Sequence, residues 1–283
     1  MRRSSREGAA GLLLVLPPLI VLVFLILVPA GQAVVDTLRV EKDGHVTYSL
    51  ARYTEMLRTI SLRRSVGFTV SVTFASVAAT FGLAYPLALY LRFTRGWIST
   101  LLGALFIVPL FIPVVIASFA MVTFLVNHGY VGTLLYYLGL EDMPTLVYNA
   151  TGIVLTEVWA SIPFATLVLL AGLQGIDDTL IDSARDVGAG PFRTFAAIIL
   201  PMNLVATVIT LSLLFIGILG SFTIPYLVGG NAPQMMSVVM TNYFTNYARP
   251  DISVALAVIT FAIASLAGAA YVVGVSRRER HAI

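Results

Sequence analysis

The sequence predicts an all-α membrane protein with six spanning helices. Of the 283 residues, 58% are hydrophobic and only 11% are charged, whereas a soluble domain carries roughly a quarter charged residues. The mean hydropathy is +0.93, and six apolar stretches are long enough for a helix to cross a bilayer, which takes about 20 residues. Six such helices and their loops use the whole chain, so we expect a single transmembrane domain over residues 1–283. This composition excludes a water-soluble globular enzyme.

The first span is expected at about 9–35, after a basic head with Arg2, Arg3 and Arg6. A cleaved signal peptide is the alternative, because Gly31-Gln32-Ala33 offers the small residues of a cleavage site. The apolar stretch is about 22 residues long, however, whereas a signal peptide has an apolar region of about 7–15 residues. An uncleaved anchor is therefore favoured.

Five further spans follow along the chain. They are expected at about 66–91, 98–126, 151–173, 202–227 and 252–275. Pro109 and Pro113 lie inside the third span, which is tolerable because neighbouring helices can satisfy the freed carbonyl groups. Short amphipathic helices are predicted in two of the connecting segments, at Tyr53–Arg58 and Val131–Leu140.

Six spans place both termini on one side of the membrane. Each terminus carries three arginines, which the positive-inside rule assigns to the cytoplasm. The loops 92–100 and 174–201 then face the cytoplasm as well. Ten basic residues lie on this side and seven on the other. The difference between the two sides is small, because the segment 36–65 alone carries six of the seven basic residues on the outer side.

The sequence contains no constellation typical of catalysis. Cysteine is absent, which excludes disulfides and thiolate sites, and the histidines at 45, 128 and 281 lie in different loops, so no helical metal pair exists. A phosphate-binding G-x-x-x-x-G-K-[ST] loop needs a lysine after a glycine, but Lys42, the only lysine, follows Glu41. We therefore expect no ATPase activity, cofactor or metal on this chain. Nucleic acid is not expected as a partner, because no basic cluster is interleaved with aromatic residues.

The inner loop 174–201 holds the most informative local pattern. Asp177 or Asp178 can cap a short helix. Three apolar residues share one face of this helix: Leu180, Ala184 and Val187. Gly188 suits the left-handed conformation that ends it, and Pro191 suits the first turn of a second helix. The exposed apolar edge would fit a groove on another protein, and an ordinary interfacial linker is the alternative.

This loop also resembles the EAA loop of inner-membrane permease subunits of ABC importers. The family pattern is Glu-Ala-Ala, three residues, Gly, nine residues and Ile-x-Leu-Pro. The chain has Asp182-Ser183-Ala184, Gly188 and Ile198-Ile199-Leu200-Pro201 at the same spacing. Asp182 keeps the charge of the family's Glu, and Ser183 keeps the small size of its Ala.

The resemblance implies the six-helix MetI-like fold, in which this loop is a cytoplasmic coupling helix that fits a cleft on a separate ATPase. The residues to which it assigns that contact are Asp182, Ser183, Ala184, Asp186, Gly188, Ala189, Leu200 and Pro201. ATP would then be used by the ATPase and not by this chain.

The resemblance also implies partners and a location. The partners are a second permease subunit that is related but different, two ATPase subunits and an extracytoplasmic solute-binding protein. The chain would lie in the lipid bilayer of the bacterial cytoplasmic (inner) membrane, and the loops 36–65, 127–150 and 228–251 would face the binding protein. A stand-alone secondary transporter is the alternative, and it would require several intramembrane ionisable residues and inverted repeats.

Two segments resemble the permeases for spermidine and putrescine in particular. These are Ala184-Arg185-Asp186-Val187-Gly188-Ala189 and the run from Ser221 to Gly230 at the end of the fifth span. A polyamine is therefore the expected substrate. A sugar, iron, thiamine or an oxyanion is the alternative.

Polar residues inside the spans are candidates for the translocation pathway. Glu157 is the only acidic residue well inside a span, and an intramembrane carboxylate is a functional candidate by default. A structural partner for a nearby hydroxyl, or a hydrated position near the interface, is the alternative. One face of the fifth span adds the polar candidates Asn203, Thr207, Thr210 and Ser221.

A similar polar stripe lies on the second span. Its members are Thr69, Thr73, Ser76 and Thr80. Such stripes also mediate tight helix packing in membranes, so packing and pore lining remain alternatives for both spans.

Overall fold

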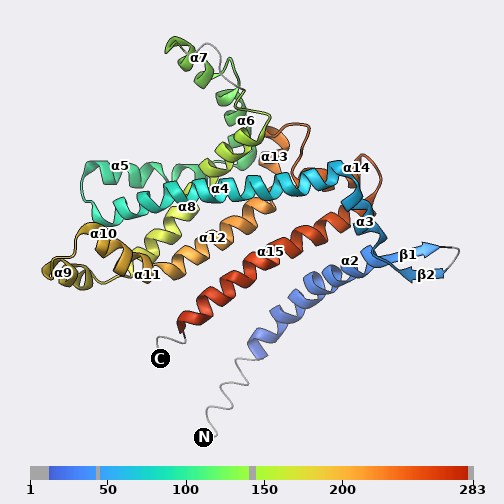
Figure 1. The fold of residues 1–283 in the computed structure, drawn as a ribbon, viewed down its shortest axis with the longest axis horizontal. Helices are drawn as coiled ribbons and strands as arrows, with labels where there is room; N and C mark the ends of the chain where they lie inside the picture. The colour runs from blue at the N-terminus through green and yellow to red at the C-terminus, as the bar shows by residue number, and fades with distance from the viewer. Residues whose placement is uncertain (1–12, 43–44, 140–144, 280–283) are drawn as a thin grey trace, which may run out of the picture. The chain divides into compact units, whose positions relative to one another are not determined.

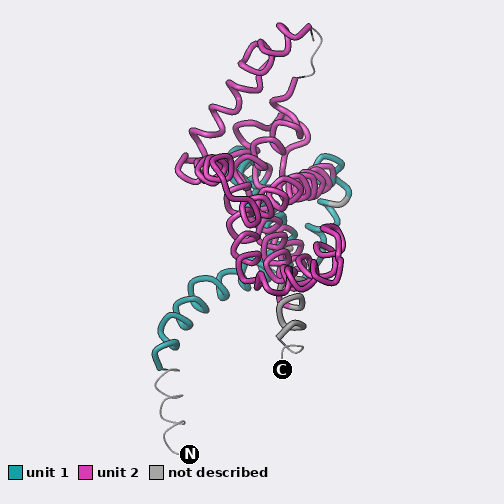
Figure 2. The backbone as a smooth tube through the Cα atoms, turned by 90° about the vertical axis from the view of Figure 1, so that its left-hand side faces the viewer, with its two compact units in different colours: residues 1–63, 240–259 teal, residues 64–239, 260–283 magenta. Residues whose placement is uncertain are grey.

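The computed structural model describes residues 13–42, 45–139 and 145–279, and helices make up most of them (Figure 1). Five helices are long and apolar enough to cross a membrane, and a sixth span results if the bent pair 191–202 and 204–219 counts as one. The predicted all-α fold is confirmed. The chain divides into two compact units, which are residues 1–63 with 240–259 and residues 64–239 with 260–283 (Figure 2).

The first unit begins with the span Leu13–Leu38. Its second half consists of a π-helical turn, η1 (Val23–Leu27), and α2 (Val28–Leu38). The short amphipathic helix predicted after it is confirmed as α3 (Ala51–Arg58).

A hairpin that we did not predict lies between these helices. It pairs β1 (Arg39–Lys42) with β2 (His45–Tyr48), and the two strands are antiparallel. The sequence carries a signal for it, because an Asp-Gly pair between two short runs favours a two-residue hairpin turn, and Asp43-Gly44 stands at that place.

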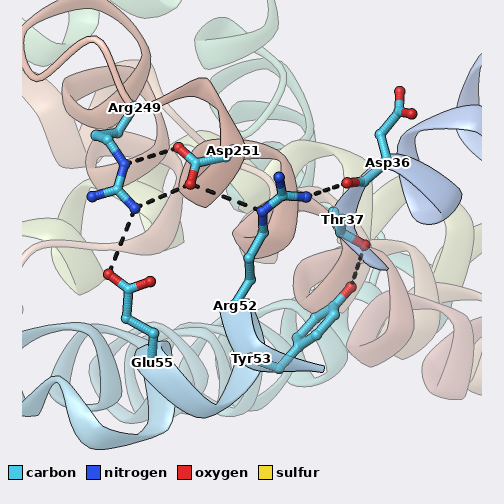
Figure 3. A network of polar contacts seen from close by, with 7 residues as sticks. All are labelled: Asp36, Thr37, Arg52, Tyr53, Glu55, Arg249 and Asp251. Atoms are coloured by element: carbon cyan, nitrogen blue, oxygen red, sulfur yellow. Dashed lines mark hydrogen bonds and ion pairs between the residues drawn. The ribbon is translucent and has the colours of Figure 1, made fainter. Parts of the chain in front are cut away.

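Charged side chains join α2, α3 and the start of α15 (Pro250–Glu279) within the first unit (Figure 3). Arg249 donates two hydrogen bonds of 3.0 Å to the Asp251 carboxylate and lies 3.5 Å from Glu55. Arg52 donates to the backbone carbonyl of Asp36 and lies 3.9 Å from Asp251. Exposed ion pairs of this kind contribute little singly, but together they connect α2, α3 and the start of α15.

The second unit is organised around α4 (Ile60–Phe93), α8 (Ala150–Gln174) and α12 (Leu204–Leu219). The spans predicted at 66–91, 151–173 and 252–275 correspond to α4, α8 and α15. Buried apolar side chains from α4, α8 and α12 form one cluster: Val77, Ala84, Tyr85, Ala88, Ala165, Leu169, Leu173, Leu214 and Ile218. In a membrane such packing depends on close van der Waals contact, which the small residues of this cluster allow.

The third predicted span, 98–126, is not one helix. The chain forms α5 (Trp97–Leu105), the short 3-10 helix η2 (Val108–Phe111) and α6 (Val114–Leu125). Pro109 and Pro113 explain the breaks, because proline lacks an N–H group and clashes with the preceding helical turn. The stretch long enough to cross a membrane is instead Val114–Tyr137, and it includes α7 (Tyr130–Tyr137), which confirms a short helix near the predicted 131–140.

The fifth predicted span, 202–227, is also interrupted. The helical stretch Pro191–Met202 meets α12 at 67°, and α12 ends before Gly220, after which α13 (Thr223–Val228) continues. The segment predicted as the loop 228–251 contains a further helix, α14 (Met236–Thr245). Met235 and Met236 are fully buried, so the start of this segment belongs to the protein interior.

Candidate functional site

The loop 174–201 folds as the sequence predicts at both ends of its first helix. α9 (Asp178–Asp186) begins after Asp177, whose carboxylate accepts a hydrogen bond of 2.9 Å from the N–H of Thr179. This bond holds the pKa of Asp177 below its usual value. α9 ends at Asp186, and two residues later Gly188 has a φ of 81°, while the N–H of Ala189 donates to the carbonyl of Ala184 at 2.9 Å. The capping aspartate and the left-handed glycine are both confirmed.

The second helix of the loop continues without a gap toward α12. α10 (Pro191–Thr194) starts with Pro191 in its first turn, as predicted. It runs into a π-helical segment, η3 (Phe195–Ile199), and then into α11 (Leu200–Met202). Asn203 separates α11 from α12, at the 67° bend.

The apolar edge predicted for α9 is exposed at two of its three residues, Leu180 and Val187, while Ala184 is buried. Ile181 and Ala184 are buried, and Ile181 packs in the same cluster as α4 and α8. Leu180 is 44% exposed and Val187 is 85% exposed. Leu180 and Ile181 are adjacent apolar residues, so the sequence permits either to point inward, and tertiary packing selects Ile181.

Two large apolar side chains remain on the outside of the turn that joins α9 to α10. Val187 lies just before Gly188, and Phe192 in α10 is 82% exposed. Phe192 was not among the predicted contact residues. The sequence feature that could have indicated Phe192 is its position, an aromatic residue directly after Pro191 in an otherwise polar loop.

The residues of the EAA pattern fall into two groups. Ala184 and Gly188 build the loop, since one is buried and the other forms the turn. The exposed residues include Asp182, Ser183 and Asp186. Asp182 accepts a hydrogen bond of 3.2 Å from Arg185, and both side chains are 66% exposed. The Ala189 side chain is half-buried, whereas Leu200 and Pro201 are exposed at the start of α11.

Glu157 lies in the interior of the second unit. It is 4% exposed on α8, and its carboxyl group shares a hydrogen bond with the Ser221 side chain. Its Oε1 atom has no partner among the described residues. The hydroxyl of Ser237 in α14 donates to the Ser221 carbonyl at 2.5 Å. Glu157 and Ser221, two of the predicted pathway candidates, therefore lie together, which matches the alternative of a structural hydroxyl partner for Glu157. Ser237 was not a candidate, because α14 was not predicted.

The other pathway candidates are buried within this one chain. Asn203, Thr207 and Thr210 are at most 7% exposed. The Nδ2 atom of Asn203 lies 3.5 Å from the carbonyl of Leu169 on α8, and the hydroxyl of Thr210 donates to the carbonyl of Ala206. This side of α12 therefore contacts α8.

The polar stripe on α4 is also buried. Its four members, Thr69, Thr73, Ser76 and Thr80, are inaccessible to solvent. The hydroxyl of Thr69 accepts a hydrogen bond of 2.8 Å from the N–H of Met236 at the start of α14. This contact matches the packing alternative for Thr69.

A family model described as "Binding-protein-dependent transport system inner membrane component" matches residues 81–281. The chain belongs to this family. It is a permease subunit of an ABC importer and a multi-pass protein of the inner membrane, and the resemblance to the permease subunits of ABC importers is confirmed.

Relatives of this permease differ in the solute that their names specify. It is 30% identical over 276 residues to the trehalose/maltose transport system permease protein MalF of Thermococcus litoralis, covering 91% of this chain and 90% of that protein. It is 26% identical to the spermidine/putrescine transport system permease protein PotB of Escherichia coli, covering 71% and 73%. It is 28% identical to the molybdenum transport system permease protein ModB of Azotobacter vinelandii, covering 56% and 69%.

Solved structures show the same fold for this permease. A bacterial ABC transporter that imports the acidic polysaccharide alginate matches with a TM-score of 0.75 at 20% identity, covering 99% of both chains. The methionine ABC transporter MetNI matches with a TM-score of 0.58 at 19% identity, covering 75% of this chain and 95% of that one.

Proposed function

We propose that this permease forms half of a translocation pathway and couples it to a separate ATPase through the loop of α9 and α10. The observation that carries the proposal is the turn at Gly188, which is fixed by hydrogen bonds and exposes Val187 and Phe192 beside it. Apolar side chains on a rigid turn suit a cleft on another protein. We place this loop and both termini in the cytoplasm, as the positive-inside rule favours.

The remaining partners follow from the same role. One chain supplies half of a pathway, so a second permease, related but different, completes it, and two ATPase subunits provide the energy. A structure of the alginate transporter contains a periplasmic protein that carries an alginate pentasaccharide. By analogy, an extracytoplasmic binding protein delivers solute to this permease.

Replacing Gly188 by valine tests the coupling role. Gly188 has a φ of 81°, and a Cβ there would meet no atom within 4 Å, so the penalty comes from the backbone and not from a clash. A left-handed non-glycine residue costs about 1–2 kcal/mol, which we expect to lower solute uptake about tenfold while the protein still inserts in the membrane.

Gly190→Val is the matched control for this substitution. Gly190 has a φ of −68° and also has open space around its Cβ position. Uptake in membrane vesicles and the amount of assembled complex are measured for both variants. Equal uptake by Gly188→Val and Gly190→Val would contradict a coupling role for the turn.

For the substrate, we propose a cationic amine such as spermidine or putrescine. The spans carry one acidic side chain in their interior, Glu157, and a carboxylate attracts a cation more strongly in a low dielectric than in water. The likeness to PotB over 71% of this chain supports the same substrate class.

A sugar is the second candidate. The observation that favours it is the likeness to the trehalose/maltose permease MalF, which reaches 30% identity over 91% of this chain. Binding of polyamines, maltose and trehalose to the cognate solute-binding protein separates the two candidates. Tight binding of a sugar without affinity for polyamines would refute the cationic substrate and leave the permease role intact.

Glu157→Gln tests the role of the charge at constant shape. We expect spermidine uptake by the assembled complex to fall about tenfold, because a neutral amide no longer attracts the cation, and one charge-assisted hydrogen bond contributes about 1.5–3 kcal/mol. Ser221→Ala is the control, since it removes the hydrogen bond to Glu157 and keeps the carboxylate. If both variants lose thermal stability and uptake to the same degree, Glu157 is a structural partner of Ser221 and the proposed role of its charge is wrong.

A further inference from the structure

Arg92 joins three segments of the second unit. It lies in the last turn of α4, and its Nε atom donates to the carbonyl of Leu173 near the end of α8 at 3.2 Å. One of its terminal nitrogens donates to the carbonyl of Ile176 at 3.2 Å and to the carboxylate of Asp178 at 2.6 Å. Its side chain is 18% exposed, whereas that of Asp178 is 67% exposed.

The guanidinium group of Arg92 suits both the free carbonyl groups at the end of α8 and the carboxylate at the start of α9. The last carbonyl groups of a helix have no partner within it, and a positive charge at that end is favourable to the helix dipole. A guanidinium group holds several donors in one plane, which a lysine cannot reproduce. Arg92 can therefore satisfy the end of α8 and pair with the first turn of α9 at the same time.

The connection matters because α4 is distant in sequence from the coupling loop. α9 is linked to α8 by three residues, 175–177, so a displacement of α9 acts on α8 through the backbone. α4 has no such covalent link. Among the described residues, the Arg92–Asp178 pair joins it to α9, and Ile181 of α9 belongs to the same buried apolar cluster as Ala84 and Ala88 of α4.

We infer that Arg92 is a positioning residue, which holds α9 against α4 and passes the displacement of the coupling loop to this span. The inference rests on the proposed coupling function. It assigns the energy-coupling path a residue outside the EAA pattern, about 90 residues before it in the sequence.

The test compares three variants of the full complex. Arg92→Gln removes the charge and the planar set of donors, and Asp178→Asn removes only the ion pair. Arg95→Gln is the control, because it removes an exposed arginine in the loop after α4, three residues beyond Arg92. Solute uptake per ATP hydrolysed is measured in proteoliposomes, and hydrogen exchange of the α9 amides is measured in the same samples.

For Arg92→Gln we expect uptake per ATP to fall about tenfold and α9 amides to exchange about tenfold faster, as the loss of one charge-assisted hydrogen bond implies. Asp178→Asn should show a smaller change in the same direction, and Arg95→Gln should match the unmodified complex. A purely structural role would lower uptake and ATP hydrolysis together and leave their ratio unchanged.

Two results would overturn the inference. One is an uptake-to-ATP ratio for Arg92→Gln equal to that of Arg95→Gln, whatever the exchange rate of the α9 amides. The other applies if Arg92→Gln does not assemble: the inference then fails if Asp178→Asn leaves both quantities unchanged. If the unmodified permease binds no ATPase, the proposed function fails, and this is seen before any variant is compared.

Discussion

Replacing Val187 and Phe192 together by aspartate should reduce uptake at least about a hundredfold, since truncating a central apolar contact can cost 2 kcal/mol or more. Both side chains are more than four-fifths exposed in the isolated chain, so the substitutions remove no packing within the permease. They would instead place two carboxylates in the cleft of the ATPase, where an unpaired buried charge is costly. The measurements are solute uptake and recovery of the ATPase with the permease from detergent extracts.

The matched control keeps the apolar character of both positions. Val187→Ile with Phe192→Leu should retain the ATPase and most of the uptake, because hydrophobic residues of similar volume substitute well. Full recovery of the ATPase with the aspartate variant would show that the exposed turn is not the docking surface.

Gly172→Ala should lower the free energy of unfolding of the permease by about 1–3 kcal/mol, the usual cost of overpacking. A Cβ at Gly172 on α8 would overlap the Oδ1 atom of Asn203 and the Cβ of Ala206 on α12. Asn203 stands at the 67° bend that leads from the coupling loop into α12. The added methyl group therefore forces apart two spans where the loop joins them.

Gly217→Ala provides the control for this prediction. Gly217 lies in α12, and a Cβ there would meet no atom within 4 Å. Thermal unfolding of both variants in detergent gives the comparison, with uptake as a second measurement. Equal unfolding temperatures would show that the contact between Gly172 and Asn203 does not limit stability.

Local rules explain why the loop 174–201 could be predicted in detail. The cap at Asp177, the left-handed turn at Gly188 and the start of α10 at Pro191 each depend on a residue's own backbone preference or on a bond to its near neighbours. The structure confirms all three. The same holds for α4, α8 and α15, because an uninterrupted apolar stretch in a bilayer must satisfy its backbone within one helix.

At the third span, prolines limited how well the helix boundaries could be predicted. Pro109 stands in the first turn of η2 and Pro113 directly precedes α6, each after a break in the helix, although a proline is tolerated within α4 at Pro86 and within α8 at Pro163. The residue type is the same in both cases, and the outcome depends on whether neighbouring segments satisfy the freed carbonyl groups. That information lies outside the local sequence.

The sequence by itself determined the membrane class, most of the spans and the turn at Gly188, because composition and short-range bonds decide these. Only the tertiary structure decided that Ile181 and not Leu180 faces inward, that α14 places Ser237 beside Ser221, and that Arg92 reaches α8 and α9. Each of these joins residues far apart in the chain or chooses between adjacent residues of the same character. Such choices depend on the packing of whole helices, because a contact stabilises the fold only when both partners are in place.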